Sequence, residues 1–438
     1  MYAYQLYDFG KILKAQRLNP DRLAKLQSDK LSKLIRHSYA HVPYVRNMLD
    51  ARGIVPGDVA RIEDIGLLPL TDKSFYQSLK PGERAADNLP VERCKTFQTS
   101  GTTGLPLRFH MTRRDFTMRN LNSARAYLAS GYEPWQRMAV LAGDRVVNEK
   151  RTWNEKLGFW RRREISSWKD PEQWLDELET WKPHVLVGRV TTLVLLAEAF
   201  RERPRASLRP KRVFASAEVL DDASRNFLAT TFGCPVLDFY FTFEGGCLAW
   251  ECPACGGYHM NSDMVIIEVL RNGNPVSPGE EGEVVITNLH AYAMPLIRYR
   301  QGDSVVLSRK TPRCGRGLPL LDRIYGRKED LIVLRNGRRI PPQAVPHVFI
   351  PVPGIRKWQV VQPAVDRLKI LIEPKDGFDE SARRILLEEM MKLLRDDVRL
   401  EIIVVDSLER DREAKFRPIV SEVKKEAGQP EARGAELP

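Results

Sequence analysis

Residues 96–106 read TFQTSGTTGLP, and the interpretation of the whole fold starts from this stretch. It contains two glycines, one proline and five hydroxyl-bearing side chains. A loop of this composition lets backbone N–H groups approach phosphate oxygens closely, while the hydroxyls add further donors. It differs from the GxxxxGK[ST] phosphate loop, because no lysine follows the last glycine. Composition alone therefore leaves two interpretations open, a phosphate-binding loop and an ordinary surface loop.

Length, hydropathy and charge limit the class of protein. The 438 residues exceed the size at which one hydrophobic core usually stops growing, which predicts two or three domains. No window offers the roughly 18 consecutive apolar residues of a membrane span, and the N-terminus lacks a secretion signal, so we expect a cytoplasmic protein. The 69 basic and 57 acidic residues give a net charge of +12. Since no nucleic-acid-binding signature accompanies this scattered charge, it favours phosphate-bearing small molecules over nucleic acid.

Helical and strand-like segments alternate through the first two thirds of the chain. The first fifty residues show apolar positions at three- and four-residue spacings, which predicts helices. Further helical segments at 115–131 and 192–202 alternate with short apolar runs, namely MAVLAG (138–143), HVLVG (184–188), RVFASAE (212–218) and PVLDFY (235–240). Such alternation is typical of a layered α/β domain.

The pattern changes towards the C-terminus. Strand-like runs separated by turns at 265–270, 282–289 and 304–308 predict a β subdomain, placed at about 245–325 and attached to the main sheet of a domain that covers 1–330. Four more strand-like runs and a helix at 381–397 predict a small α+β domain at 331–426. The last residues, 427–438, show no periodicity and predict a disordered tail.

Three of the six cysteines fall within nine residues, which in a cytosolic chain favours a metal over disulfides. Cys252 and Cys255 form a CxxC pair, and His259 follows four residues later. Tetrahedral zinc needs a fourth ligand, which either Cys314 or Cys247 could supply. Buried free cysteines are the alternative.

Four segments in a fixed order resemble the motifs of the adenylate-forming enzymes, the superfamily of acyl- and aryl-CoA synthetases, luciferases and adenylation domains. They are TSGTTGLP (99–106), RYRQGD (298–303), GRKEDLIVLRNGRRIPP (326–342) and REAKFRP (412–418). The stretches WECPACGGYHMNSDMVIIEV (250–269) and CGRGLPLLDRIYGR (314–327) look closest to the branch of phenylacetate–CoA ligases and coenzyme F synthetases. The resemblance runs from about residue 20 to residue 425.

The resemblance implies a large layered N-terminal AMP-binding domain and a small, mobile C-terminal domain that rotates about Glu329. It assigns the ATP phosphates to the loop residues Thr99, Ser100, Gly101, Thr102, Thr103 and Gly104. It assigns the ribose hydroxyls to Asp303 and the ribose and phosphate region to Arg327. It places adenine against Ser216, Ala217 and Glu218, with Asp238 and Tyr240 beside them.

Two further residues carry catalytic roles by resemblance. Glu244 is the expected magnesium ligand, and Lys415 is expected at the α-phosphate and the substrate carboxylate. The family pattern Y-G-x-[ST]-E appears at 240–244 as Tyr-Phe-Thr-Phe-Glu, so the hydroxyl residue before the glutamate is missing. Either Thr242 substitutes for that hydroxyl or its contact with the reacting phosphate is absent. Ala414 also stands before Lys415 where the family usually has glycine.

The resemblance favours Cys314 as the fourth ligand of a structural zinc. It implies an ATP-dependent carboxylate–CoA ligase that uses ATP, Mg²⁺ and CoA on a small carboxylic acid, with His184, Gly188, Arg189 and Tyr240 in the pocket wall. One alternative is an adenylate-forming enzyme with another acceptor, which transfers AMP to a deazaflavin hydroxyl or forms an amide. The other is an inactive nucleotide-binding relative. Whether the protein forms a homodimer is left open.

Overall fold

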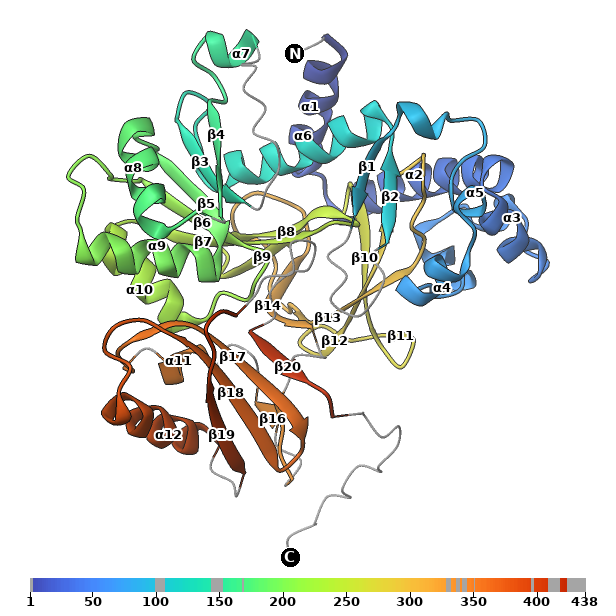
Figure 1. Cartoon of the computed structure of the whole chain (residues 1–438). Coiled ribbons are helices and arrows are strands. Elements are labelled where there is room, and N and C mark those ends of the chain that lie inside the picture. Colours follow the sequence, from blue (N-terminus) through green and yellow to red (C-terminus); the bar gives the residue numbers. More distant parts are fainter. Residues whose placement is uncertain are drawn as a thin grey trace, which may run out of the picture. The chain divides into compact units, whose positions relative to one another are not determined.

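The computed structural model describes residues 3–98, 107–142, 153–167, 169–327, 332–335, 339–340, 345–349, 351–394, 398–408 and 418–423. The chain divides into two compact units, Met1–Gly326 and Arg327–Pro438. The first unit combines helices with a large sheet, and the second is a small α+β unit (Figure 1).

The first hundred residues are mostly helical, in agreement with their periodicity. The longest helix, α2 (Pro20–His41), begins at Asn19, whose side chain accepts a hydrogen bond from the backbone N–H of Arg22. It ends at Val42, which is extended and precedes the proline that opens α3 (Pro43–Asp50). The shorter elements are α1 (Ala3–Ala15), α4 (Lys73–Ser78), α5 (Pro81–Arg84) and the 3₁₀ segments Pro56–Asp58, Ile62–Leu67 and Val91–Arg93. No helix in the described ranges is long and apolar enough to cross a lipid bilayer.

Five parallel strands form one half of the main sheet. They are β3 (Met138–Ala142), β4 (Arg162–Ser166), β5 (Val185–Arg189), β6 (Arg212–Ser216) and β7 (Val236–Thr242), in the spatial order β4-β3-β5-β6-β7. Their apolar residues are buried on both faces, which explains the nearly continuous hydrophobic runs in the sequence. One face is covered by α8 (Pro171–Trp181), α9 (Val190–Glu202) and α10 (Asp222–Phe232), and the other by α6 (Arg113–Ala129); a short α7 spans Trp153–Lys156.

The predicted β subdomain is a continuation of this same sheet. After β7 the chain reverses, and β8 pairs antiparallel with it, so that Phe239 lies opposite Trp250. Seven strands complete a twelve-stranded sheet in the order β11-β10-β12-β13-β14-β9-β8-β7-β6-β5-β3-β4. They are β8 (Gly246–Cys252), β9 (Gly257–Met260), β10 (Val265–Arg271), β11 (Asn274–Pro275), β12 (Glu281–Asn288), β13 (Tyr299–Leu307) and β14 (Leu320–Arg327).

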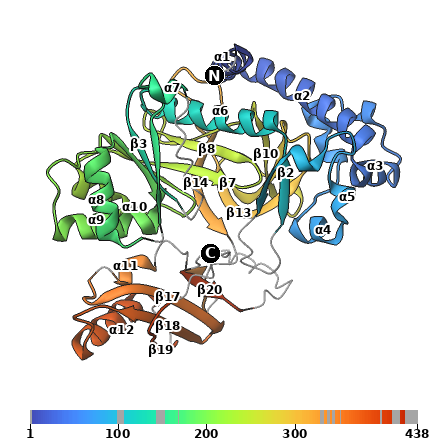
Figure 2. The same ribbon diagram turned by 45° about the horizontal axis from the view of Figure 1, so that its top comes forward.

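A separate two-stranded hairpin flanks the predicted phosphate loop. Strands β1 (Lys95–Gln98) and β2 (Arg108–Met111) pair antiparallel on either side of residues 99–106. Phe109 of β2 is buried in the same core cluster as Val265 of β10, and Figure 2 shows β2 beside this antiparallel part of the main sheet. The hairpin therefore attaches the loop's two ends to the first unit.

The second unit has its own sheet and core. Strands β17 (Ile355–Ala364), β18 (Arg367–Pro374), β19 (Arg399–Val404) and β20 (Ile419–Ser421) form a mixed sheet in the order β19-β18-β17-β20. Helix α12 (Glu380–Leu394) packs its buried face against this sheet. The remaining elements are β15 (Ile332–Val333), β16 (Arg339–Ile340) and α11 (Pro346–Phe349). The predicted α+β character of this region is confirmed.

Candidate active site

The carboxyl ends of three parallel strands gather the predicted nucleotide residues at one edge of the sheet. Strand β5 ends at Arg189, which lies opposite Ser216 at the end of β6. Ser216 in turn lies opposite Phe239 of β7, five residues before Glu244. Ligands of open α/β sheets bind outside these carboxyl ends, so the fold brings the predicted base-binding segment and the predicted magnesium ligand to the expected edge.

Tyr240 and Asp303 meet although they are 63 residues apart in the sequence. The Tyr240 hydroxyl donates a hydrogen bond to Oδ2 of Asp303 over 2.5 Å. Tyr240 belongs to the parallel half of the sheet and Asp303 to β13 in the antiparallel half. Gly302, which precedes Asp303, has a φ of +78°, a conformation that favours glycine. The predicted ribose-binding carboxylate is thus held by the tyrosine predicted beside the base.

The segment Ser216–Glu218 turns sharply at the end of β6. Ala217 has a φ of +65°, in the left-handed region that non-glycine residues rarely adopt. The Glu218 carboxylate accepts two hydrogen bonds from Thr191, from its backbone N–H at 2.8 Å and from its hydroxyl at 3.1 Å. The side chain of Glu218 is therefore directed to the first turn of α9.

The predicted magnesium ligand Glu244 lies in a tight turn between β7 and β8. Within this turn the Thr242 hydroxyl oxygen accepts a hydrogen bond from the backbone N–H of Gly245 at 2.9 Å. A Cβ atom at Gly245 would lie 2.4 Å from Cδ2 of Leu248, so a larger residue there would displace the Leu248 side chain. Glu244 is 9% exposed. Thr242 supports the turn through its oxygen and retains its hydroxyl proton as a donor.

Side chains from two other elements hold the same turn from outside. Arg119 of α6 donates to the carbonyl oxygens of Phe243 at 2.5 Å and Thr242 at 3.2 Å. The Asn288 side-chain amide donates to the Glu244 carbonyl at 3.1 Å. Sequence reasoning missed Arg119 because its partners lie more than a hundred residues away and no local pattern marks it.

Phe241, which stands where the family pattern has glycine, faces away from Asp303. Successive side chains of a strand point to opposite faces, so Phe241 lies on the face opposite Tyr240. Its ring lies 6.1 Å from that of Phe239 and 6.3 Å from that of Tyr127 in α6. The phenylalanine in place of glycine therefore adds to the aromatic packing under α6.

Asp238 lies in a buried polar group two residues before Tyr240. Its Oδ2 accepts a hydrogen bond from the Tyr258 hydroxyl at 3.0 Å, and its backbone N–H donates to Glu251 at 2.9 Å. Arg225 of α10 forms an ion pair with Glu251 at 2.9 Å. Burial raises the pKa of Asp238 to about 7. Tyr258 is a further site residue that no sequence motif indicated.

Four predicted zinc ligands come together in one place. One ligand atom from each lies within 4.8 Å of the others, and we call this set the cysteine–histidine cluster: Cys252, Cys255, His259 and Cys314. Cys255 and Gly256 donate their backbone N–H groups to the Cys252 carbonyl at 3.1 and 3.0 Å, which makes a tight knuckle. His259 Nδ1 lies 3.0 Å from the Leu318 carbonyl, and Nε2 lies 3.1 Å from Cys314 Sγ.

These contacts fit a tetrahedral zinc site. A carbonyl that accepts from one ring nitrogen fixes the histidine tautomer and directs the other nitrogen to the metal. Three thiols and one imidazole are also a common structural zinc set. Cys247, the alternative fourth ligand, is fully buried and its Sγ lies 3.7 Å from the Ala249 carbonyl. It is not part of the cluster found among the described residues.

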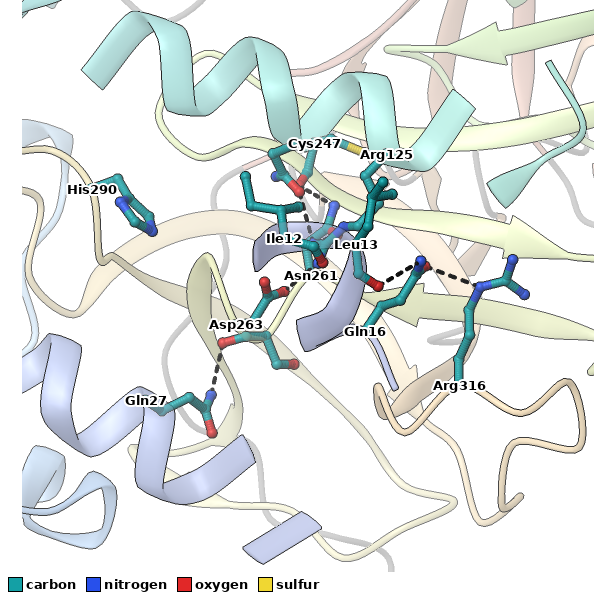
Figure 3. Close-up of polar contacts among 12 residues, drawn as sticks. Ile12, Leu13, Gln16, Gln27, Arg125, Cys247, Asn261, Asp263, His290 and Arg316 are labelled. Atoms are coloured by element: carbon teal, nitrogen blue, oxygen red, sulfur yellow. Dashed lines mark hydrogen bonds and ion pairs between the residues drawn. The ribbon is translucent and has the colours of Figure 1, made fainter. Parts of the chain in front are cut away.

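A buried polar network connects the N-terminal helices to β8 (Figure 3). Arg125 forms an ion pair with Asp263 at 2.8 Å, and both side chains are almost fully buried. Arg125 also donates to Asn122 at 2.9 Å and to Asn261. Asn122 and Asn261 both donate to the Cys247 carbonyl, at 2.9 and 2.8 Å. The start of β8, directly after the Glu244 turn, is therefore anchored to α6.

The network extends to α2 through Lys30. Its ammonium donates to the Asp263 carbonyl at 2.5 Å and lies 3.2 Å from Nε2 of His290. Burial, and then the charge of Lys30, hold the pKa of His290 well below its usual range, so Nε2 can accept from the ammonium. His290 and Asn122 also line a cavity whose wall includes Gly245. The network thus borders the turn that carries Glu244.

Some predicted residues have no described geometry, and one was placed wrongly. The phosphate loop 99–104 and Lys415 lie outside the described residues, and of Arg327 only the backbone at the end of β14 is described. His184 precedes β5 at its amino end, where Nδ1 accepts from the Arg137 backbone N–H at 3.2 Å. It therefore lies at the edge opposite Arg189, and its prediction as a pocket-wall residue was wrong.

Comparisons with known proteins agree with this architecture. Residues 332–422 match the family model described as the CapK C-terminal domain. The chain is 26% identical over 393 residues to the phenylacetate–coenzyme A ligase of Thermus thermophilus, covering 86% of this chain and 87% of that protein. It is 28% identical over 337 residues to the phenylacetate–coenzyme A ligase of Escherichia coli, covering 74% and 75%.

A solved structure extends the likeness to the fold. The crystal structure of 2-hydroxyisobutyryl-CoA ligase in the postadenylation state superimposes with a TM-score of 0.76 at 20% identity, covering 93% of this chain and 91% of that one. The ordered motifs, the sequence relatives that span most of the chain and this shared fold agree. The chain is similar to phenylacetate–CoA ligases over most of its length, and it shares the fold of an acyl-CoA ligase solved in its postadenylation state.

Proposed function

We propose that the protein is an ATP-dependent carboxylate–CoA ligase. In the first step a carboxylate oxygen attacks the α-phosphorus of ATP, and pyrophosphate leaves. In the second step the CoA thiolate attacks the acyl carbon of the adenylate, a thioester forms, and AMP leaves. The observation that carries this proposal is the contact between Tyr240 and Asp303 beside the Glu244 turn, at the sheet edge where α/β proteins bind ligands.

The contact between Tyr240 and Asp303 supports a position for the nucleotide. We assign the Asp303 carboxylate to the ribose hydroxyls, because it can accept two hydrogen bonds while Tyr240 fixes its orientation. The base then lies near the ends of β6 and β7, beside Ser216 and Ala217. Asp238 lies two residues before Tyr240 on β7, further from the carboxyl end of the strand, and its partner Tyr258 lies on β9.

Two anions must approach each other in the first step, so the site needs positive charge and oriented donors. Glu244 would hold Mg²⁺, which supplies charge neutralisation at the phosphates. The clamped turn suits this role, because Arg119 and Asn288 hold its carbonyls and so fix its backbone. The loop 99–104, Arg327 and Lys415 are assigned to the phosphates, ribose and α-phosphate by their motifs alone.

The cysteine–histidine cluster is proposed to hold a structural zinc. Its four protein ligands complete a tetrahedral set and leave no open position for substrate. The knuckle follows β8, His259 lies in β9, and Cys314 lies in the loop between β13 and β14. The ion would therefore link strands and a loop that are distant in the sequence.

A different acceptor is the alternative function. The stretches at 250–269 and 314–327, which resemble coenzyme F synthetases as well as phenylacetate–CoA ligases, are the observation behind it. AMP transfer to a deazaflavin hydroxyl and amide formation are the two candidate reactions. An inactive relative is disfavoured, because Asp303, Arg327, Glu244 and Lys415 are all retained at their motif positions.

Pyrophosphate exchange over a panel of aryl and acyl acids tests the proposal. We expect one class of acid to give exchange and, with CoA, a thioester detected by chromatography. Asp303→Ala should weaken ATP binding by about 1.5–3 kcal/mol, or roughly 12- to 160-fold. The matched control is Asp50→Ala, an exposed carboxylate that also accepts from a tyrosine hydroxyl, that of Tyr39 at 2.8 Å. It should leave ATP binding unchanged.

The outcomes separate the candidates. Acid-dependent exchange without thioester formation would favour amide formation. Absence of exchange with every acid, together with AMP transfer to a deazaflavin, would identify the hydroxyl acceptor. No exchange with any acid and no AMP transfer, together with retained binding of ATP, would support the inactive nucleotide-binding relative. Equal effects of Asp303→Ala and Asp50→Ala would mean that the ribose is misplaced.

A further inference from the structure

The turn after β6 adopts a conformation that its own sequence disfavours. Ala217 has a φ of +65°. For an L-residue other than glycine, this left-handed region is about 1–2 kcal/mol higher in free energy than the right-handed one. Such conformations persist only when surrounding contacts over-determine them, and they cluster at binding sites. Something outside the turn must therefore hold it.

Glu218 supplies that contact. Its two carboxylate oxygens accept the backbone N–H and the hydroxyl of Thr191, at 2.8 and 3.1 Å. Thr191 is the second residue of α9, so the carboxylate lies at a helix N-terminus, where backbone N–H groups and the helix dipole favour negative charge. One side chain thus connects the β6 turn to the start of the neighbouring helix and uses both of its oxygens to do so.

Val219, the residue after Glu218, packs against Gly326 near the end of β14. A Cβ atom at Gly326 would lie 2.9 Å from Cγ2 of Val219, and Gly326 has a φ of +73°. Gly326 is the last residue of the first unit. The turn is therefore enclosed between α9 on one side and the end of β14 on the other, and its backbone can shift only if one of these contacts opens.

We infer that Glu218 is a positioning residue for the nucleotide, which acts through Thr191 and does not bind the base with its carboxylate. This inference rests on the proposed function, which places adenine at residues 216–218. The pair of hydrogen bonds holds the strained backbone of Ser216 and Ala217 in the conformation that faces the nucleotide. Without Glu218 the turn relaxes to another conformation. Nucleotide binding is then weakened by the free energy needed to return the turn to its binding conformation.

Calorimetric titration with ATP, without any acid, measures this cost. Glu218→Ala should weaken ATP binding about 5- to 30-fold, the equivalent of the strain at Ala217. Ala217→Gly in the Glu218→Ala background should restore most of the affinity, because glycine adopts this conformation without penalty. A side chain that only stabilised the fold would show no such rescue of binding.

Conservative variants separate the roles of shape and charge. Glu218→Gln keeps the length and can still accept from the Thr191 N–H, so it should bind ATP nearly as well as the wild type. Glu218→Asp keeps the charge but is one methylene shorter, so it should behave like Glu218→Ala. A carboxylate that contacted adenine directly would show the opposite order, with Gln impaired as strongly as Ala.

The control removes a helix N-terminal acceptor far from the site. In Asn19→Ala, α2 loses the side-chain oxygen that accepts from the Arg22 N–H at 2.9 Å. We expect a loss of stability similar to that of Glu218→Ala and an unchanged ATP affinity. Loss of affinity in this variant would show that general destabilisation, and not the turn, governs binding.

Failure of the inference can be distinguished from failure of the proposed function. The Glu218–Thr191 coupling is measured on thermal unfolding without ligand, by a double-mutant cycle of Glu218→Ala and Thr191→Val. A wild type that binds neither ATP nor AMP overturns the proposed function, and the inference with it, even if this coupling is present. A wild type that binds ATP with no loss in Glu218→Ala overturns the inference alone.

Discussion

Tyr240→Phe tests the contact that defines the proposed nucleotide site. The substitution removes one hydroxyl and keeps the ring, so the packing of β7 is preserved. The lost hydrogen bond to Asp303 is 2.5 Å long, and Tyr240 is 9% exposed. A buried hydrogen bond to a charged group contributes about 1.5–3 kcal/mol. We therefore expect the folded state to lose stability of this order.

The expected shift in melting temperature follows from the size of the first unit, Met1–Gly326. At about 2.1 cal/mol/K per residue, its unfolding entropy is roughly 0.7 kcal/mol/K, so the midpoint should fall by about 2–4 °C. ATP binding should weaken as well, because the nucleotide must now order the Asp303 side chain. That ordering costs roughly 0.5–1.5 kcal/mol, which corresponds to about a two- to tenfold increase in Kd.

Thermal unfolding and calorimetric titration with ATP measure the two effects. Tyr39→Phe is the matched control, because Tyr39 donates to Asp50 at 2.8 Å on the exposed surface. It should change stability by less than about 0.5 kcal/mol and leave the Kd for ATP as in the wild type. A normal ATP affinity in Tyr240→Phe, with the expected fall in melting temperature, would refute the assignment of Asp303 to the ribose. No change in either quantity would mean that the hydrogen bond does not form.

Three other predictions concern the proposed zinc ion, the role of Lys415 and the pH dependence of stability. Chelation of zinc should lower the melting temperature and expose thiols to a colorimetric reagent; protein purified without chelator that contains no zinc by elemental analysis would exclude the metal. Lys415→Ala should slow adenylate formation by about a hundred- to a thousandfold yet leave the reaction of a supplied acyl-adenylate with thiol near normal; Lys392→Ala, an exposed lysine of α12, is the control. Burial raises the pKa of Asp238 from 3.8 to about 7, so the folded state keeps a proton that the unfolded chain loses, and stability should fall as the pH rises between these values. In Asp238→Asn this fall should be smaller, and thermal unfolding at pH 5 and pH 8 measures the difference.

The sequence by itself determined the local elements, the chemistry and the family. Continuous apolar runs such as those of β3, β5 and β6 indicate strands buried on both faces, because period and composition depend only on near neighbours. The CxxC pair and the nearby His259 predicted three members of the cysteine–histidine cluster for the same reason. The ordered motifs led to the family, and the comparisons agree with it.

The tertiary structure decided which distant residues meet. Tyr240 reaches Asp303 only because β7 and β13 belong to one sheet, and Glu218 reaches Thr191 only because β5 and β6 are neighbours in it. These contacts join residues tens of positions apart, and their formation depends on the burial of whole strands and helices. No local pattern in the sequence carries that information, because each side chain is compatible with many partners until the sheet is assembled.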